Sequence, residues 1–305
     1  MIYKILTINI AVVLLFSCKS DGDLTKPTGV FYQSTSFDNL DRDYILYVPS
    51  TYDENSSLPL VFNLHGGAMT ARDQMEQVSD MRSLADSENF ILVYPQSTSE
   101  NGIPIWNLGG ENSKATDVDD VGYISHLINK ISNFYSINLD RVYVVGFSNG
   151  GYLSFELACK LSEEIAAFAS VAGHMFIDTY NECMPTHPTP FLSINGTEDN
   201  YEGIESYFLS IENSNNYWIE YNKTDLIPVI SDIENINTFD GSTVQLFSWI
   251  NGKNGVEIDH YKILGGGHSW PSLNTNSDKD MSNGDIDSNK IIWEFLSRFD
   301  INGLR

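Results

Sequence analysis

The sequence of 305 residues predicts an α/β protein whose central sheet is mostly parallel and covered by helices on both faces. Its apolar runs, such as residues 58–64 and 90–94, are continuous and do not alternate with polar residues, which is typical of strands buried on both sides. Segments with the spacing of amphipathic helices lie between these runs. Hydrophobic residues make up 42% of the chain and no repeat divides it, so one main globular domain is expected.

Each expected element has its own local pattern. Apolar or β-branched runs predict the strands, and apolar residues three or four positions apart predict the helices. The predicted strands cover residues 30–36, 44–48, 58–64, 90–94, 142–145, 166–171, 190–195, 244–249 and 256–264. The predicted helices cover residues 72–88, 117–135, 152–161, 204–221 and 288–299, with Asp287 as the N-cap of the last one.

The first 18 residues have the composition of an export signal. Lys4 precedes a short apolar stretch at residues 5–16, and a helix that spans a bilayer needs about 20 apolar residues. The stretch ends in Leu15-Phe16-Ser17-Cys18, which resembles the lipobox of bacterial lipoproteins. In such proteins the residue at the position of Cys18 becomes the lipidated first residue. A simple signal peptide with an incidental cysteine is the alternative.

These features divide the chain into three parts. We place a signal peptide at residues 1–18, a linker at 19–38 and the main domain at 39–305. The protein is expected to be exported and held at the bacterial outer membrane or cell surface by its lipid, with a periplasmic or secreted location as the alternative. The remaining cysteines, Cys159 and Cys183, are expected to pair because thiols in exported chains are usually oxidised.

The charge of the chain excludes some classes of partner. There are 41 acidic and 17 basic residues, a net charge of −24. Such a surface repels nucleic acids and anionic membrane faces, so no nucleic acid is expected as a partner. Contact with a membrane is expected only through the lipid anchor.

The stretch from Arg141 to Gly151 carries the strongest motif. A β-branched run at residues 142–145 leads into Gly146-Phe147-Ser148-Asn149-Gly150, and a helical segment follows at once. This order predicts a nucleophile elbow, in which a sharp turn between a strand and a helix presents a reactive serine. The glycines let the strand and the helix approach closely. The amide of Asn149, at the start of the helix, can donate to a developing oxyanion.

The base is expected after the serine, because the α/β-hydrolase order is serine, acid, histidine. His268 follows a predicted strand in a glycine-rich loop, Gly265-Gly266-Gly267-His268-Ser269-Trp270-Pro271, and is the predicted base. His260 lies inside a strand pattern and is expected to be packed. His187 is expected in a surface loop, and His174 could line a pocket.

The orienting acid is expected at the end of a strand. The strand at residues 190–195 leads into Asn195-Gly196-Thr197-Glu198-Asp199, where a glycine turn delivers a carboxylate to the edge at which open α/β sheets bind ligands. Asp199 is the predicted acid and Glu198 its rival. A second oxyanion donor is expected from His65-Gly66-Gly67, namely the amide of Gly67 together with that of Ala68.

No metal or cofactor is expected. Residues 278–284 share some aspartate spacing with calcium-binding loops, but the glycine is displaced and the final glutamate is absent.

Taken together, these motifs resemble the secreted polyhydroxybutyrate depolymerase and feruloyl esterase group of α/β-hydrolases. They run in order from about residue 40 to residue 300. The matching stretches are Leu64-His65-Gly66-Gly67, Val93-Tyr94-Pro95, Trp106-Asn107, Asp119-Asp120-Val121-Gly122-Tyr123, residues 141–151, Val171-Ala172-Gly173, residues 195–199, residues 266–271 and Ile292-Trp293-Glu294-Phe295. The chain departs from the group at residues 200–203 and 222–224, near the expected mouth of the substrate site.

The resemblance implies a serine carboxylester hydrolase that acts through Ser148, His268 and Asp199 and forms an acyl-enzyme. The candidates for lining its pocket are His65, Trp106, Tyr201 and Trp270. For the three aromatic residues the alternative is that they are simply part of the core. The ester could be a polyester, a feruloylated or acetylated plant polysaccharide, or a small lipid. The alternatives are an acetyl xylan esterase or a serine peptidase of the same fold, and an inactive carbohydrate-binding surface lipoprotein.

Overall fold

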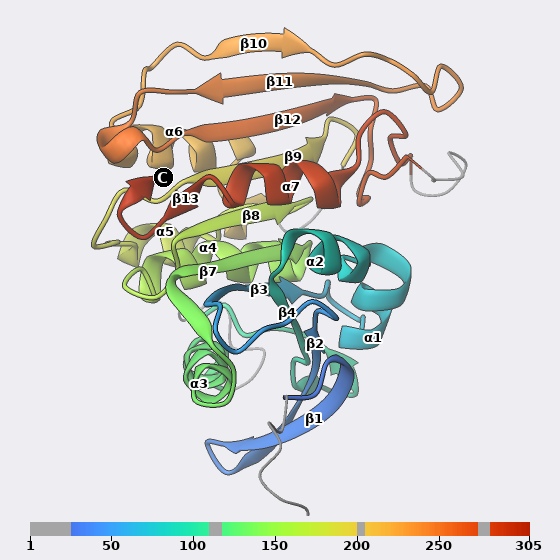
Figure 1. Cartoon of the computed structure of the whole chain (residues 1–305). Coiled ribbons are helices and arrows are strands. Elements are labelled where there is room, and N and C mark those ends of the chain that lie inside the picture. The colour runs from blue at the N-terminus through green and yellow to red at the C-terminus, as the bar shows by residue number, and fades with distance from the viewer. Residues whose placement is uncertain (1–25, 110–117, 200–204, 274–280) are drawn as a thin grey trace, which may run out of the picture.

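A ten-stranded sheet runs through the whole protein, with helices on both of its faces (Figure 1). The computed structural model describes residues 26–109, 118–199, 205–273 and 281–305. The predicted signal peptide with Cys18, the pocket candidate Tyr201 and residues 278–280 of the calcium-loop-like segment lie outside these ranges. The α/β class predicted from the apolar runs is confirmed.

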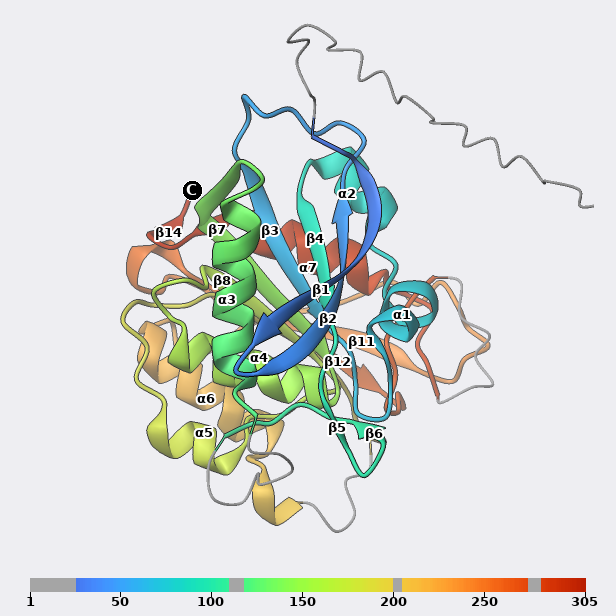
Figure 2. The same ribbon diagram turned by 90° about the horizontal axis from the view of Figure 1, so that it is seen from below.

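The six central strands are parallel, and the two strands at each edge are antiparallel. In sheet order the strands are β1 (Gly29–Phe37), β2 (Leu40–Val48), β4 (Ile91–Pro95), β3 (Leu58–Leu64), β7 (Ile137–Phe147), β8 (Ala167–Val171), β9 (Phe191–Gly196), β12 (Ile258–Leu264), β11 (Thr243–Trp249) and β10 (Val229–Asp232). Two short hairpins join β5 (Ser99–Glu100) to β6 (Ile103–Pro104), and β13 (Phe299–Asp300) to β14 (Gly303–Leu304). Figure 2 shows how strongly β1 and β2 twist at their edge of the sheet.

The helices divide between the two faces and bury a separate apolar cluster on each. One cluster unites the sheet with α3 (Asp120–Ser132), α4 (Asn149–Lys160) and α6 (Ile211–Asn222). The other unites it with α2 (Arg82–Glu88) and α7 (Ser288–Leu296). The remaining helical segments are α1 (Ala71–Asp73), η1 (Gln74–Val78), α5 (Ile177–Glu182), η2 (Glu205–Tyr207) and η3 (Lys253–Gly255). No helix of the described ranges is both long and apolar enough to cross a membrane.

Two expectations about the N-terminal half need correction. The single helix predicted over residues 72–88 is interrupted at Ser79, because polar contacts hold the chain there. The hydroxyl of Tyr94 donates to the carbonyl oxygen of Ser79 at 2.7 Å and accepts from the amide of Met81 at 3.1 Å. The domain boundary at residue 39 also falls too late, since β1 pairs with β2 along its whole length, and residues 29–37 are part of the sheet.

The parallel centre of the sheet explains where the site lies. Strands β7, β8, β9 and β12 all point the same way, with Val171 opposite both Phe147 and Ile194, and Ile194 opposite Tyr261. The loops that follow these strands therefore meet at one edge. The elbow, the acid loop and the histidine loop are three of those loops.

Candidate active site

Three side chains from distant parts of the chain meet at this edge. The Oγ atom of Ser148 lies 2.8 Å from Nε2 of His268. The Nδ1 atom of His268 lies 2.9 and 3.0 Å from the two carboxylate oxygens of Asp199. This is the hydrogen-bond order in which an imidazole takes a proton from a hydroxyl while a carboxylate fixes its orientation. Asp199 is almost completely shielded, with a side chain 2% exposed, whereas that of His268 is 40% exposed.

Ser148 is held in a backbone conformation that few non-glycine residues adopt. Its φ and ψ are 51° and −118°, and its amide donates to the carbonyl oxygen of Val171 at 2.9 Å. The flanking glycines are required by space, because a Cβ on Gly146 would lie 2.1 Å from the carbonyl oxygen of Gly150. A Cβ on Gly150 would lie 2.5 Å from the carbonyl oxygen of Leu64. The turn that carries Ser148 therefore packs closely against the ends of β3 and β7, and Ser148 lies at its tip.

The acid loop and the histidine loop pack directly on one another. A Cβ on Gly196 would lie 2.1 Å from the carbonyl oxygen of Gly266, so only glycine permits this approach. The amide of Glu198 donates to the same carbonyl oxygen at 2.8 Å. The Glu198 side chain is exposed, and it is Asp199 that contacts His268. The structure thus brings together the predicted serine, acid and base, and leaves out the rival acid.

Two backbone amides are available beside the serine. Asn149 is the first residue of α4, so its amide has no partner inside the helix. Gly67 lies next to it, since a Cβ on Gly67 would be 3.6 Å from the Cβ of Asn149. The amide of Ala68 is already committed, because it donates to the carbonyl oxygen of Pro104 at 2.8 Å. Gly67 and Asn149 therefore remain the candidate oxyanion donors, whereas the amide of Ala68 is already bonded elsewhere.

His65 was expected in the substrate pocket, but it is completely buried beneath the oxyanion loop. Its Nδ1 atom lies 2.7 Å from the carbonyl oxygen of Gly66, and its Nε2 atom accepts from the amide of Ser97 at 3.1 Å. Burial lowers the pKa of His65 to about 4, so the ring is neutral at physiological pH. His65 fixes the shape of the loop that carries Gly67 and does not face a substrate.

Trp106 and Trp270 are also buried, at 1% and 7% exposed, so neither is the pocket wall that was expected. The indole N–H of Trp106 donates to the carbonyl oxygen of His65 at 2.8 Å, and its backbone amide donates to Oδ1 of Asn149 at 2.7 Å. Trp106 thus links the two stretches that supply the oxyanion donors. The indole N–H of Trp270 donates to Asn289 at 3.1 Å, which anchors the histidine loop to α7.

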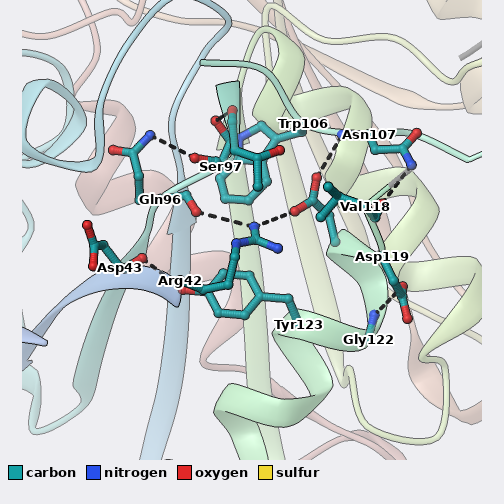
Figure 3. A network of polar contacts seen from close by, with 12 residues as sticks. Arg42, Asp43, Gln96, Ser97, Trp106, Asn107, Val118, Asp119, Gly122 and Tyr123 are labelled. Atoms are coloured by element: carbon teal, nitrogen blue, oxygen red, sulfur yellow. Dashed lines mark hydrogen bonds and ion pairs between the residues drawn. The ribbon is translucent and has the colours of Figure 1, made fainter. Parts of the chain in front are cut away.

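A buried ion pair between Arg42 and Asp120 supports the segments around His65 and Trp106 (Figure 3). The guanidinium of Arg42 donates to Oδ1 of Asp120 at 2.5 Å and to the carbonyl oxygen of Gln96 at 3.3 Å. The other oxygen of Asp120 accepts from the amide of Asn107 at 2.8 Å. Arg42 lies over the ring of Tyr123, with 3.9 Å from its central carbon to the ring centroid. Through Gln96 and Asn107, the pair holds both ends of residues 97–106. Ser97 and Trp106 at the ends of this segment bond to His65.

Neither Arg42 nor Tyr152 was predicted to have a role. Arg42 precedes the predicted strand at residues 44–48 and lies between two aspartates, so it resembles an ordinary surface charge in the sequence. Tyr152 lies one helical turn after Ser148, and its ring packs on Phe208 with centroids 4.4 Å apart. Burial raises the pKa of the Tyr152 hydroxyl, the charge of Asp199 adds to this effect, and the Ser148 hydroxyl opposes it.

The other histidines and the cysteines occupy the expected kinds of place. His260 is buried in β12, with Nδ1 2.9 Å from Oγ of Ser193, and His174 lines a cavity beside Asp199. His187 is partly exposed in the loop before β9. Cys159, near the end of α4, and Cys183, after α5, form a disulfide. Within the described ranges, no group of three or more histidine, cysteine or acidic side chains is arranged to hold a metal.

A parallel sheet that presents a serine on an elbow, with a histidine and an acid from later loops, defines an α/β-hydrolase. The chain has the fold of this superfamily, and its sequence is similar to esterases of the kind that the motifs indicated. The family described as "Esterase PHB depolymerase" matches residues 42–184. This match confirms the resemblance to the polyhydroxybutyrate depolymerase and feruloyl esterase group.

The names of individual relatives describe them as esterases. A bifunctional acetylxylan esterase/xylanase of Neocallimastix patriciarum is 29% identical over 86% of this chain and 34% of its own length. Feruloyl esterase B of Piromyces equi is 26% identical over 85% of this chain and 46% of its own. The chain therefore spans less than half the length of either relative.

Solved structures show the same fold at lower identity. An acetyl xylan esterase from Aspergillus awamori superposes with a TM-score of 0.58 at 16% identity, over 82% of this chain and 97% of its own. A ferulic acid esterase from Anaeromyces mucronatus superposes with a TM-score of 0.53 at 16% identity, over 89% and 95%.

Proposed function

We propose that the protein is a serine carboxylester hydrolase. The observation that carries this proposal is the continuous hydrogen-bonded series from Ser148 through His268 to Asp199, with separations of 2.8 and 2.9 Å. Folding and packing do not require a buried carboxylate, an exposed imidazole and a serine on an elbow to be aligned. Their alignment is what nucleophilic catalysis by a hydroxyl requires. The names of the relatives agree with this chemistry.

The reaction follows from the positions of these groups. His268 takes the proton of the Ser148 hydroxyl as its oxygen attacks the ester carbonyl, and Asp199 stabilises the imidazolium that results. The carbonyl oxygen becomes an oxyanion, to which the amides of Gly67 and Asn149 donate. His268 then protonates the departing alcohol. Water, activated by the same histidine, attacks the acyl-enzyme and releases the acid and the free serine.

We further propose that the ester is an acetyl or feruloyl ester of a plant polysaccharide, in which a sugar hydroxyl supplies the alcohol part. The support is the names of the relatives, which refer to acetylxylan and feruloyl esters. A polyester of hydroxy acids is the alternative, and it is supported by the matching family alone. A panel of acetylated xylan, methyl ferulate and hydroxybutyrate oligomers separates these substrates.

The decisive test is the replacement Ser148→Ala, assayed with p-nitrophenyl acetate. The hydroxyl is the only atom lost, so we expect turnover to fall by about 10⁴-fold or more with an unchanged circular dichroism spectrum. Ser83→Ala, at an exposed serine of α2, is the matched control and should keep full activity. Turnover that survives in the Ser148→Ala protein would reject the mechanism.

We also propose that the protein is exported and held at the cell surface by a lipid on Cys18. This rests on the lipobox-like sequence before Cys18. The disulfide between Cys159 and Cys183 suits an oxidising compartment. Membrane fractionation of a Cys18→Ser variant provides the test, since a variant that still sediments with membranes excludes the lipid anchor.

A further inference from the structure

A large cavity lies next to the predicted acid Asp199, on the side of the sheet covered by α6. It has a volume of about 800 Å³, within the range of small-molecule sites, and reaches Asp199 and His174 at one end. Neither Ser148 nor His268 lines it. We call it the α6 groove, formed by one face of strands β9, β12 and β11 and by α6.

The register of the sheet explains how side chains gather in the groove. Ser193 of β9 lies opposite His260 of β12, which in turn lies opposite Phe247 of β11. Two residues along, Asn195 lies opposite Lys262. Because alternate residues of a strand share a face, Asn195, His260, Lys262, Phe247 and Trp249 all line the groove.

Among the described residues that line the groove, one buried polar atom has no hydrogen-bond partner. Asn195 is 6% exposed, and its Nδ2 atom donates to the carbonyl oxygen of Gly173 at 3.2 Å. Its Oδ1 atom is buried and accepts no hydrogen bond from any described residue. A buried acceptor without a partner is unfavourable, so a ligand donor that reached this atom from the groove would gain a hydrogen bond. The amide side chains of Asn215 and Asn216 line the same groove.

The charges in the groove favour an uncharged ligand. Burial lowers the pKa of His260 to about 3 and also lowers that of His174, so both rings are neutral at physiological pH. Of the described residues that line the groove, Asp199 and Glu212 have carboxylates and Lys262 is basic. An anion would have to approach two negative charges, whereas hydroxyl groups can donate to carboxylate and amide oxygens and accept from amide N–H groups.

The aromatic residues supply a surface for a ring. Phe247 and Trp249 are both partly exposed, and their rings are 23° from parallel with centroids 6.3 Å apart. Two such faces in a row match the apolar faces of successive sugar rings, while amide groups match their hydroxyls.

The position of the groove indicates which part of the ester would occupy it. The oxyanion donors Gly67 and Asn149 hold the carbonyl oxygen, so the departing alcohol oxygen must face His268. The groove approaches the site from the side of Asp199, the partner of His268. We infer that the α6 groove binds the neutral sugar units of the alcohol portion of the substrate, an inference that rests on the proposed esterase function.

Calorimetry with unesterified sugars tests this inference without turnover. Xylotetraose and cellotetraose are titrated into the Ser148→Ala protein, and saturable binding of either is expected. Trp249→Ala in the same background should weaken binding about tenfold, because one stacking face is lost. Phe239→Ala, at an aromatic residue 92% exposed and outside the groove, should leave binding unchanged. Circular dichroism confirms that each variant is folded, and Trp249→Phe should restore most of the affinity.

Three results would overturn the inference. These are no binding of either tetraose, equal binding by the Trp249→Ala protein, and equally tight binding of anionic tetragalacturonate. Hydrolysis of p-nitrophenyl acetate by the unmodified protein is measured separately. An active enzyme that binds no tetraose rejects the sugar site alone, whereas an inactive enzyme rejects the proposed function itself.

Discussion

The two sides of Ser148 are built in opposite ways. On the oxyanion side, His65, Trp106 and Asp120 are completely or almost completely buried, and they bond to one another through the loops that supply the oxyanion donors. On the acid side, His268 is exposed, and Oδ1 of Asn195 in the α6 groove accepts no hydrogen bond from the part of the chain that the structure describes. The difference indicates a division of labour. Donors that must meet a charge at one fixed point are held rigidly, whereas space is left where the larger part of a substrate would bind.

The acid side offers the largest expected effect. Replacing Asp199 by Asn removes the charge that fixes and stabilises the His268 imidazolium, so kcat for p-nitrophenyl acetate should fall by about 10⁴-fold. The adjacent Glu198→Gln is the matched control, because its exposed side chain makes no contact with His268 among the bonds described, and its activity should stay within about twofold. A greater loss in the Glu198→Gln protein than in the Asp199→Asn protein would contradict the assignment of the acid.

A substitution on the oxyanion side should lower both the free energy of unfolding and kcat. Asp120→Asn leaves the guanidinium of Arg42 buried without its counter-ion, which should lower the free energy of unfolding by about 3–5 kcal/mol. Because Asp120 also holds the amide of Asn107, kcat should fall about tenfold with little change in KM.

The neighbouring Asp119 provides the comparison for this prediction. Its side chain caps α3 by accepting from the amide of Gly122, so Asp119→Ala should cost about 1 kcal/mol and leave kcat unchanged. Urea unfolding and steady-state kinetics measure both quantities. If the two variants behave alike, the ion pair does not position the oxyanion loop.

Each side also contains a buried neutral histidine, and this predicts a smaller effect that depends on pH. The pKa of His65 is lowered to about 4 and that of His260 to about 3, against 6.5 for the free side chain. Below pH 6.5 the unfolded chain therefore binds protons that the folded protein does not, and stability decreases as the pH falls. For His65 the loss is about 3 kcal/mol when the pH falls from 6.5 to 4.

Asp259 works in the opposite direction, because burial raises its pKa to about 6. The folded protein then binds the extra proton, and this contribution to stability grows as the pH falls from 6 to 3.8.

The effect of His260 can be tested by urea unfolding at pH 7.5, 6.5 and 5.5. The free energy of unfolding should decrease less with falling pH for His260→Asn than for the parent protein. An equal decrease in both proteins would show that His260 does not remain neutral when folded.

Much of the site could be predicted because its motifs are local. The elbow needs a strand, two glycines and a helix within about ten residues, and all of these are visible in the sequence around Ser148. The loops of Asp199 and His268 each follow a predicted strand and contain the glycine that their close contact requires. Chain order then selects the acid and the base.

The errors share a physical cause, which is that long-range packing has no local pattern. His65, Trp106 and Trp270 were expected to face a substrate because aromatic residues near a site look alike whether they are exposed or buried. The break at Ser79 depends on a hydroxyl from Tyr94, a residue of another strand. Strand β10 was missed because its four residues are all exposed and have no alternating pattern.

The backbone angles of Ser148 have a consequence for how this protein could change under selection. A residue with a Cβ adopts φ 51° and ψ −118° at a cost of about 1–3 kcal/mol, whereas glycine adopts them with little penalty. An alanine at this position would keep the unfavourable geometry, but a glycine would relieve it and unfold at a higher temperature. Thermal stability favours glycine at position 148, whereas the reaction requires serine. A lineage that no longer used the reaction could therefore lose the hydroxyl and gain stability.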